Sequence, residues 1–409
     1  MLSPRGVTVA IAGLSMWFAA RLLGSPGLEV VAIGIAVLPF LAGLPTRIGE
    51  RRIAVKRHLS EGRVAPGTRV TATLSVENLS PARTALLLLE DQLPPPLGRP
   101  ARLVITPIRG HGRREVAYTI VPPSRGRYRI GPVRIDATDP FGLSRLRLKV
   151  DDIVELLVTP EIEDLSSPPD AATGVGVGST RARQLIRAGE EYYTMRSYQE
   201  GDDLRRIHWP SVARTGELMI RQHESTRRAS ATVFIDTRET AIGRAHEASF
   251  ERAVSAAASI AMLLSQGGFT VRLATPDAPA VVLSTDRLLD ALASLEQDRA
   301  GSLAGSLTHL REGAAADASL VFVAAPPASQ ELPSLVRAGA GYGPKLAVLV
   351  HPADPATAPP SRRAQLEARA THASLTMMRA GWDCLLLSPT TRLVERWHIP
   401  RERRLASNA

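Results

Sequence analysis

The sequence predicts an α+β multidomain protein with an N-terminal two-helix transmembrane hairpin, a β-sandwich and an α/β domain built on a parallel sheet. Three patterns favour this architecture. Two apolar runs open the chain at residues 7–24 and 28–45. Short segments in which apolar and polar residues alternate follow as far as residue 160. From residue 230 onward, helical patterns alternate with continuous apolar strands, which is typical of α/β domains.

Changes in composition along the chain place the domain boundaries. The 409 residues and the hydrophobic content of 44% are sufficient for several cores. The predicted parts are a transmembrane hairpin over 1–48, a β-sandwich over 49–165, a linker with a polar segment over 166–229, and an α/β domain over 230–409.

The two apolar runs are each close to the ~20 residues that cross a bilayer as a helix. A cleaved signal peptide is the alternative, because Arg5 precedes the first run and "FAA" follows its apolar core. The second run and the cations behind it favour an uncleaved hairpin. The positive-inside rule then places both termini and the soluble domains in the cytoplasm, with the protein crossing the inner (plasma) membrane twice. The cations counted are Arg5, Arg47, Arg51, Arg52, Lys56 and Arg57.

The net charge of +10 raises the question of a nucleic-acid partner. The basic residues are mostly arginines that are spread along the chain among acids, and only 4% of residues are aromatic. We therefore predict no nucleic-acid partner and favour a basic surface beside anionic lipid. The single cysteine, Cys384, excludes a disulfide within the chain and is predicted to be buried as a small apolar residue.

Alternating segments at 69–80, 114–135 and 153–160 predict the antiparallel strands of the sandwich. An asparagine turn is expected at 76–81, and a hairpin tip at 124–128 with Gly126 as its permissive residue. A Pro-, Gly- and Ser-rich linker follows at 166–180.

The last part of the chain predicts a parallel sheet with helices on both faces. No glycine-rich phosphate fingerprint opens any of its helices, so no nucleotide cofactor is expected. Strands are predicted at 231–237, 269–275, 280–284, 318–326, 344–352 and 381–388, and helices at 245–266, 286–297 and 361–372.

The segment 198–224, "YQEGDDLRRIHWPSVARTGELMIRQHE", is the most polar part of the chain. Asp202 and Asp203 suggest either a metal-binding carboxylate pair or the first turn of a helix. The following "LRRIHW" has helical spacing, which favours a helix start in which the carboxylates cap free N–H groups. Pro210 ends that helix or begins the next, Gly216 stops the next one, and a strand follows.

Two roles remain open for this segment. It forms either a buried polar network anchored by Trp209 or a docking surface for an acidic partner, where an exposed Trp beside Arg is typical of binding hot spots. His208 and His223 lack the third ligand and the spacing of a zinc site. No Ser-His-Asp or Cys-His constellation is present, so we predict no catalytic residue.

The same segment resembles the hallmark of the domain of unknown function 58 family, R-x-Y-x-x-G-D-x-x-R-x-I-x-W followed by A-R. The order of the predicted parts also resembles that family. The resemblance implies a partner of MoxR-type AAA+ ATPases, often beside a transglutaminase-like membrane protein, with a chaperone-like or assembly role. The matching positions are Arg196, Tyr198, Gly201, Asp202, Arg205, Ile207, Trp209, Ala213, Arg214 and Leu218.

The resemblance further implies that the α/β domain is von Willebrand factor A-like. Such domains hold Mg²⁺ through D-x-S-x-S after the first strand. Here the stretch is "DTRET", so Asp236 and Thr240 form a degenerate remnant and Arg238 replaces the first serine. A guanidinium repels a cation and can pair with Asp236. We therefore predict no bound metal or cofactor, with Mg²⁺ at Asp236 as the alternative.

Together these observations predict a non-enzymatic, membrane-anchored protein-interaction or assembly factor that acts with a MoxR-type AAA+ ATPase. Its partners would be the lipid bilayer and proteins. The alternative function is a metal-dependent hydrolase that uses the carboxylates of Asp202, Asp203 and Asp236.

Overall fold

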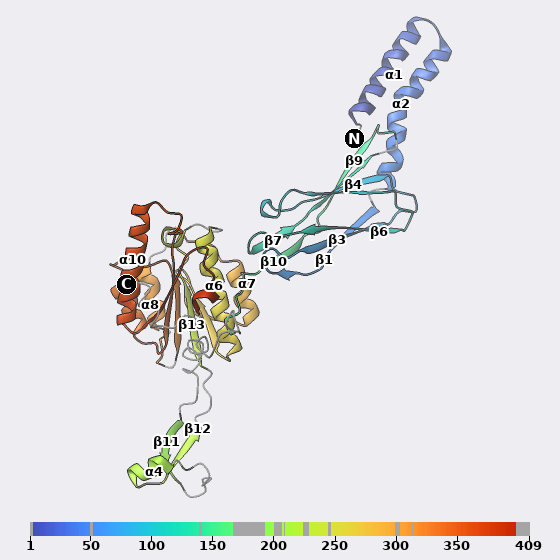
Figure 1. Cartoon of the computed structure of the whole chain (residues 1–409). Helices are drawn as coiled ribbons and strands as arrows, with labels where there is room; N and C mark the ends of the chain where they lie inside the picture. The colour runs from blue at the N-terminus through green and yellow to red at the C-terminus, as the bar shows by residue number, and fades with distance from the viewer. Residues whose placement is uncertain are drawn as a thin grey trace, which may run out of the picture. The chain divides into compact units, whose positions relative to one another are not determined.

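The structure is a computed structural model with an α+β architecture and several sheets. Contacts divide the chain into two units, Met1–Thr159 and Pro160–Ala409 (Figure 1). The structure describes residues 3–49, 52–138, 141–166, 193–199, 207, 209–223, 229–243, 247–298, 303–312, 314–316 and 318–397.

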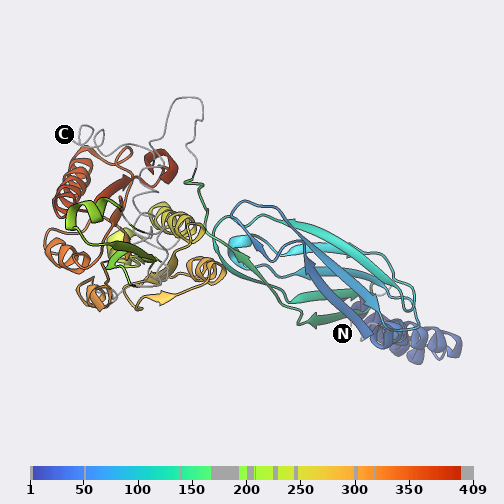
Figure 2. The same cartoon turned by 90° about the horizontal axis from the view of Figure 1, so that it is seen from below.

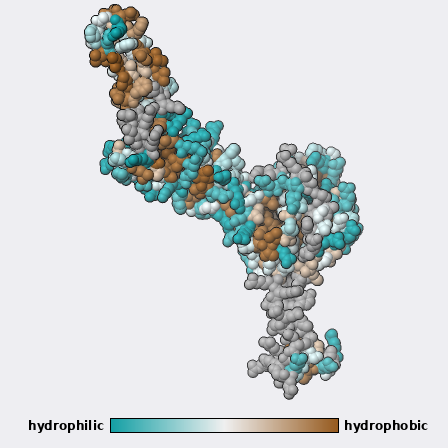
Figure 3. Space-filling model, turned by 180° about the vertical axis from the view of Figure 1, so that it is seen from behind, coloured by the Kyte–Doolittle hydropathy of each residue, from teal (hydrophilic) through white to brown (hydrophobic). Residues whose placement is uncertain are grey.

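Two helices open the first unit, α1 (Pro4–Leu22) and α2 (Pro26–Gly49). They pack closely through small residues, since a Cβ added to Gly13 would lie 2.5 Å from the backbone nitrogen of Ala36. The outer faces expose large apolar side chains such as Phe18 and Phe40, and apolar residues cover much of the visible hairpin in Figure 3.

Among the described residues, no helix is both long and apolar enough to cross a membrane. The hairpin expected from the sequence forms, but the prediction that its helices span a bilayer is not supported. Arg5 and Arg21 lie near the two ends of α1 and shorten its uncharged stretch.

The rest of the first unit is a two-layered β structure. One layer is the sheet β1-β3-β6, and the other consists of the sheets β5-β4-β8-β9 and β2-β10-β7. Apolar side chains from both layers meet in two core clusters, in agreement with the alternation in the sequence. The elements are β1 (Ile53–Leu59), β2 (Arg63–Val64), β3 (Val70–Asn78), β4 (Leu86–Asp91), η2 (Pro95–Leu97), β5 (Ala101–Ile105), β6 (Arg113–Ile120), β7 (Gly126–Ile130), β8 (Val133–Thr138), β9 (Arg145–Val150) and β10 (Val154–Val158).

Two predicted turns have different outcomes. The asparagine turn is confirmed, since the Ser80 backbone N–H donates to Asn78 Oδ1 over 3.0 Å. The hairpin tip at 124–128 is wrong, because β6 pairs with β3 while β7 pairs with β10 in the other layer. The Tyr128 hydroxyl donates to the Ser124 carbonyl over 2.9 Å and holds a corner between the layers.

Arg57, one of the cations counted for the positive-inside rule, is buried between the layers. It forms an ion pair with Asp91, and both side chains are 0% exposed. Arg57 Nε and Nη2 donate to the two Asp91 oxygens over 3.1 and 2.5 Å, and the Tyr118 hydroxyl donates to Asp91 Oδ2 over 2.5 Å. Burial, together with the hydrogen bond and charge of Asp91, raises the pKa of Tyr118. This polar network is therefore internal, and Arg57 does not contribute to the surface charge.

The second unit is built on a six-stranded sheet in the order β15-β14-β13-β16-β17-β18. The predicted strands are present, but the sheet is mixed because β15 runs antiparallel to β14. A tight turn between Thr275 and Ala278 sends the short β15 back along its neighbour. The strands are β13 (Ser230–Ile235), β14 (Thr270–Ala274), β15 (Val281–Val282), β16 (Ser319–Ala324), β17 (Lys345–Val350) and β18 (Asp383–Leu387).

Helices cover both faces of this sheet (Figures 1 and 2). One core cluster contains residues of α6, α7 and α11, and the other contains residues of α8, α9 and α10. The predicted double cover explains why the central strands are apolar throughout. The helices are α5 (Glu239–Ile242), α6 (Ala248–Gln266), α7 (Thr285–Ala293), α8 (Leu303–Glu312), α9 (Leu332–Gly339), α10 (Pro360–Arg379) and α11 (Leu393–Trp397).

A buried carboxylate, Glu163, fixes the first segment of the second unit to the helical layer. Its side chain accepts the backbone N–H groups of Leu393 and Val394, at the start of α11, over 3.1 and 2.9 Å. Arg252 on α6 donates to the same carboxylate over 2.8 Å. The oxygens of Glu163 therefore satisfy two donors of a helix terminus and one guanidinium.

The hallmark segment contributes β11 (Tyr193–Ser197), α4 (Trp209–Thr215) and β12 (Met219–His223). The two strands pair antiparallel. The helix expected over "LRRIHW" is wrong at Ile207, which forms an antiparallel bridge with Ile220. The next helix, which was predicted to end at Gly216, is α4: it begins at Trp209, has Pro210 in its first turn, and ends before Gly216, whose φ of 76° suits glycine. Residues 200–206 lie outside the described residues.

Candidate functional site

The first candidate site lies at the carboxyl ends of β13 and β16, where the chain order along the sheet reverses. Such switch points are the usual ligand sites of α/β sheets. Asp236 follows β13 directly, and its backbone N–H donates to the Val323 carbonyl on β16 over 2.8 Å. The Asp236 side chain is 1% exposed. A buried carboxylate in this position requires a partner.

Arg238 is that partner. Its Nη2 donates to Asp236 Oδ2 over 2.8 Å and its Nε to Asp236 Oδ1 over 2.9 Å, which makes a bidentate pair. The remaining arm, Nη1, donates to Glu331 Oε1 over 2.8 Å. Burial opposes the charge of Arg238, but its hydrogen bonds and ion pairs with Asp236 and Glu331 outweigh burial and raise its pKa. One guanidinium therefore joins two carboxylates at the switch point.

This donor set does not fit the Mg²⁺ that a von Willebrand factor A-like site would hold. Both oxygens of Asp236 face a permanent cation. Thr240, the second remnant of the motif, is exposed on α5. The sequence suggested that Arg238 can pair with Asp236, and the structure contains this pair. The sequence did not indicate Glu331, which lies 93 positions away from Arg238 in the chain.

Two further acids, Asp277 and Asp298, lie beside the loop that carries Asp236 and Arg238. Burial, then the hydrogen bond and charge of Asp298, raises the pKa of Asp277. The Asp298 backbone is joined to the loop after β13, because its N–H donates to the Thr237 carbonyl over 3.0 Å. Within the part of the chain that the structure describes, no group of three or more His, Cys, Asp or Glu residues could hold a metal ion. The arrangement therefore offers ion pairing.

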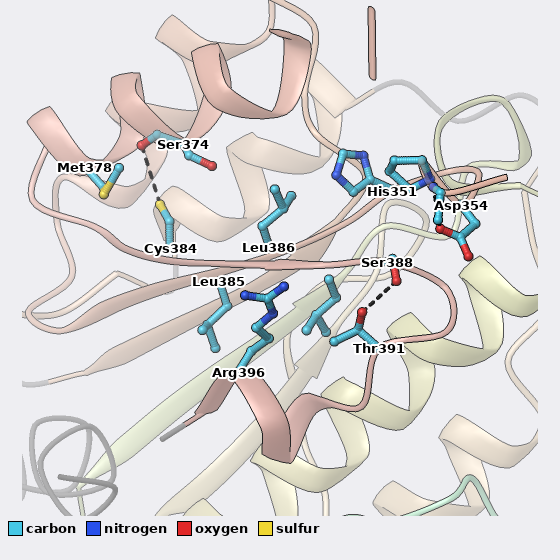
Figure 4. Close-up of a pocket in the computed structure, with 13 residues that line it drawn as sticks. His351, Asp354, Ser374, Met378, Cys384, Leu385, Leu386, Ser388, Thr391 and Arg396 are labelled. Atoms are coloured by element: carbon cyan, nitrogen blue, oxygen red, sulfur yellow. Dashed lines mark hydrogen bonds between the residues drawn. The ribbon is translucent and has the colours of Figure 1, made fainter. Parts of the chain in front are cut away.

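The second candidate site is a cavity of about 290 Å³ that runs along β18 and reaches the carboxyl ends of β17 and β18 (Figure 4). His351 follows β17, and its backbone N–H donates to the Leu387 carbonyl over 2.9 Å. Ser388 and Thr391 share a hydrogen bond of 2.6 Å at the end of β18. Residues of α10 and α11 complete the wall, and Arg396 of α11 approaches β18 in Figure 4.

His351 is 4% exposed, and its Nδ1 has no hydrogen-bond partner among the described residues. Burial lowers its pKa, although the charges of Glu367 and Asp354 oppose this. The described residues also show no hydrogen bond from His351 to Ser388 or Thr391, so the pocket lacks a paired nucleophile and base. Sequence analysis missed this site, although a histidine directly after a buried strand was a usable signal.

The lowered pKa of His351 predicts a loss of stability in mild acid. An unfolded histidine near pKa 6.5 binds a proton more readily than the buried one, so stability is complete above that pH and falls as the pH drops below it. For one such histidine, the free energy of unfolding changes by at most about 1.4 kcal/mol per pH unit. The free energy of unfolding can be measured with denaturant between about pH 7.5 and 5, the range around the histidine pKa. Its dependence on pH should be weaker in His351→Gln than in the wild type. An unchanged dependence would contradict the prediction.

The hallmark residues that the structure describes lie on the small β11-α4-β12 motif. Arg196 is on β11, and the Tyr198 backbone N–H donates to the Leu218 carbonyl over 2.8 Å. Trp209, at the start of α4, is 66% exposed, and Leu218 is 42% exposed. Of the two roles left open for this segment, the exposure of Trp209 favours the docking surface, because the described part of this motif has no layer that covers the indole.

The remaining hallmark positions divide into two groups. Ala213 and Arg214 are exposed on α4, with Arg214 in its last turn. Gly201, Asp202 and Arg205, together with Asp203, lie outside the described residues. The carboxylate pair of the hydrolase alternative is among them.

Comparisons with known proteins identify the segment that carries the hallmark. The family model "Protein of unknown function DUF58" matches residues 194–283. The resemblance to the domain of unknown function 58 family is confirmed over this segment. A curated relative, "Uncharacterized protein YeaD" of Bacillus subtilis (strain 168), is 25% identical over 253 residues, which is 59% of this chain and 60% of that protein.

Solved structures show only a remote likeness. The CARDB domain of the PF1109 protein from Pyrococcus furiosus is 13% identical, with a TM-score of 0.21 over 26% of this chain and 91% of that domain. The C-terminal domain of wzt is 11% identical, with a TM-score of 0.22 over 31% of this chain and 85% of that one. Scores this low carry no functional conclusion.

Proposed function

We propose that this protein is a non-enzymatic interaction or assembly factor whose hallmark segment docks an acidic surface of a MoxR-type AAA+ ATPase. The exposed Trp209 carries the proposal. A tryptophan with 66% of its surface in solvent is accessible to a partner, and Trp and Arg are among the residues most enriched in binding hot spots. Arg214 supplies a cation on the same short helix.

The α/β unit supports a binding role. Resemblance to von Willebrand factor A-like domains suggests a domain that binds proteins, although fold analogy alone does not establish function. At the switch point, Arg238 forms ion pairs with Asp236 and Glu331, and Asp236 is the carboxylate that would have to bind a metal ion. The described residues therefore favour recognition over hydrolysis.

We further propose that the α1–α2 hairpin attaches the protein to a membrane by its apolar surface. Large exposed side chains occur along both helices, including Ile11, Phe18, Val30 and Phe40. Contiguous apolar surface of this kind is rare on monomeric soluble proteins and is typical of protein or membrane contacts. The soluble parts would then lie on the cytoplasmic side, where the ATPase and a transglutaminase-like membrane protein could reach them.

Replacing Trp209 with alanine tests the docking proposal. We expect the affinity for a co-expressed MoxR-type ATPase to fall at least about 30-fold, which is the effect of losing a hot-spot side chain. Arg214→Glu should weaken binding further at low salt. Leu375→Ala removes an apolar side chain that is 38% exposed on α10 and serves as the matched control. Wild-type affinity in the Trp209→Ala protein, or no ATPase crosslinked at native levels, would count against the proposal.

A further inference from the structure

The two outer faces of the β structure in the first unit differ in charge. On the sheet β5-β4-β8-β9, strand register places residues from the four strands in rows that face outward. One row is Arg102, Glu90, Arg134 and Lys149, and the next is Val104, Leu88, Asp136 and Arg147. In the row beyond these two, Arg145 on β9 lies opposite Thr138 on β8. Five cationic side chains therefore face two carboxylates on these strands.

The carboxylates orient the guanidinium groups. Arg102 Nε donates to Glu90 over 3.1 Å, and Arg145 and Arg147 pair with Asp136. Arg134 and Arg147 remain well exposed, at 62% and 74% of their side-chain surface. Their nearest approaches to carboxylate oxygens, 3.9 and 3.3 Å, are longer than a charge-assisted hydrogen bond. Beyond the end of β9, Asp151 pairs with Lys149, so the net excess is about two positive charges.

The opposite sheet, β1-β3-β6, provides an internal comparison. Its outward positions carry Lys56 and Arg113 against Glu77 and Glu115, so the formal charges cancel. The neighbouring sheet β2-β10-β7, in the same layer as the cationic face, adds Arg63, Arg127 and Arg129 against Glu155. Among the outward-facing strand positions, the excess of positive charge therefore lies on the layer that contains β5-β4-β8-β9.

This cationic face adjoins the apolar hairpin. The Ser3 backbone N–H, just before α1, donates to the Leu143 carbonyl over 2.9 Å, and the Ser3 hydroxyl donates to the Gly142 carbonyl over 2.6 Å. A Cβ on Gly6 would overlap the Leu143 carbonyl, so α1 begins in tight contact with the loop that leads into β9. The hairpin therefore begins beside the strand that carries Arg145, Arg147 and Lys149.

We propose that the outer face of β5-β4-β8-β9 is a docking surface for an anionic phospholipid bilayer. This inference rests on the proposed membrane attachment and specifies the class of lipid. Phosphate and carboxylate headgroups complement the excess of guanidinium and ammonium groups, and the face forms a depression of about 530 Å³. Exposed Leu86 and Val104 on the same face suit the apolar boundary of a lipid interface better than a nucleic acid.

Vesicle binding of the purified full chain tests this surface. We expect tighter binding to vesicles with about one third phosphatidylserine than to phosphatidylcholine alone, with a difference that shrinks as salt rises. Each Lys or Arg near an anionic surface strengthens binding about 5-fold, so Arg134→Gln/Arg147→Gln should reduce the phosphatidylserine preference about 30-fold. Lys56→Gln/Arg113→Gln removes the same charge from the opposite sheet and should leave the preference unchanged.

The outcomes separate this proposal from the one on which it rests. Binding to phosphatidylcholine with no phosphatidylserine preference overturns the docking surface and leaves attachment by the hairpin in place. Failure to bind either vesicle overturns both. The lipid surface is also rejected if the two double variants lose the phosphatidylserine preference equally. It is rejected as well if Arg134→Gln/Arg147→Gln keeps the lipid preference but loses retention on duplex DNA.

Discussion

Replacing Arg238 with serine is expected to lower the free energy of unfolding of the α/β unit by about 3–5 kcal/mol, the usual effect of removing one member of a buried ion pair. The side chains of Arg238 and Asp236 are 12% and 1% exposed, and Glu331 is 22% exposed. Without the guanidinium, the carboxylates of Asp236 and Glu331 both lose the cation that they share. Denaturant unfolding followed by the fluorescence of the buried Trp382 and Trp397 reports on this unit.

The same substitution tests why the site does not fit a cation. In Arg238→Ser the spacing becomes D-x-S-x-T, and the oxygens of Asp236 are released from the guanidinium. We expect Mg²⁺ to raise the melting temperature of this variant and to leave that of the wild type unchanged. Asp236→Asn/Arg238→Ser should lose the Mg²⁺ response. A variant as stable as the wild type would show that the ion pair has no structural role.

Replacing Asp91 with alanine is expected to destabilise the β structure of the first unit by about 3–5 kcal/mol. Arg57 would remain fully buried and would keep only a longer contact of 3.7 Å with the Asp152 carboxylate, since Asp91 supplies both oxygens of the bidentate contact. The Tyr118 hydroxyl would also lose its acceptor. Hydrogen exchange measured by mass spectrometry on peptides from β1, β4 and β6 would detect the loss locally.

Two control variants test whether burial of the ion pair causes this loss of stability. The double variant Arg57→Met/Asp91→Leu removes both charges and should recover most of the lost stability, because a packed apolar pair can replace a buried ion pair. Glu115→Ala breaks a pair whose side chains are 62% and 55% exposed, and it should cost about 1 kcal/mol or less. If Asp91→Ala and Glu115→Ala had equal effects, burial would not be the cause.

Local patterns predicted most of the secondary structure correctly. The apolar runs of β13, β16 and β17 indicated strands covered on both faces, and this is confirmed by their burial. The asparagine turn at Asn78 and the helix stop at Gly216 depend on neighbouring residues alone. The helix predicted at Ile207 was wrong because the helical spacing was outweighed by a β-bridge to Ile220, which is not a neighbour in the sequence.

The candidate site was predictable only in part. Asp236 and Arg238 are two residues apart, so their pairing could be suggested from the sequence. Glu331 contacts Arg238 across 93 positions, and no local pattern indicates that contact. The sequence left open whether Trp209 is buried or exposed, and 66% of its surface is exposed in the structure. The function of the hallmark segment therefore depends on an exposure that sequence reasoning did not resolve.

The sequence by itself determined the order of the parts, the alternation that makes strands, and the arginine that replaces a metal ligand at position 238. Only the tertiary structure decided which charges are buried. Lys56 and Arg57 are adjacent cations, yet Lys56 faces solvent while Arg57 lies between the layers. The strand directs alternate side chains to opposite faces, and burial of a charge is tolerated only where folding brings a partner such as Asp91 into contact with it.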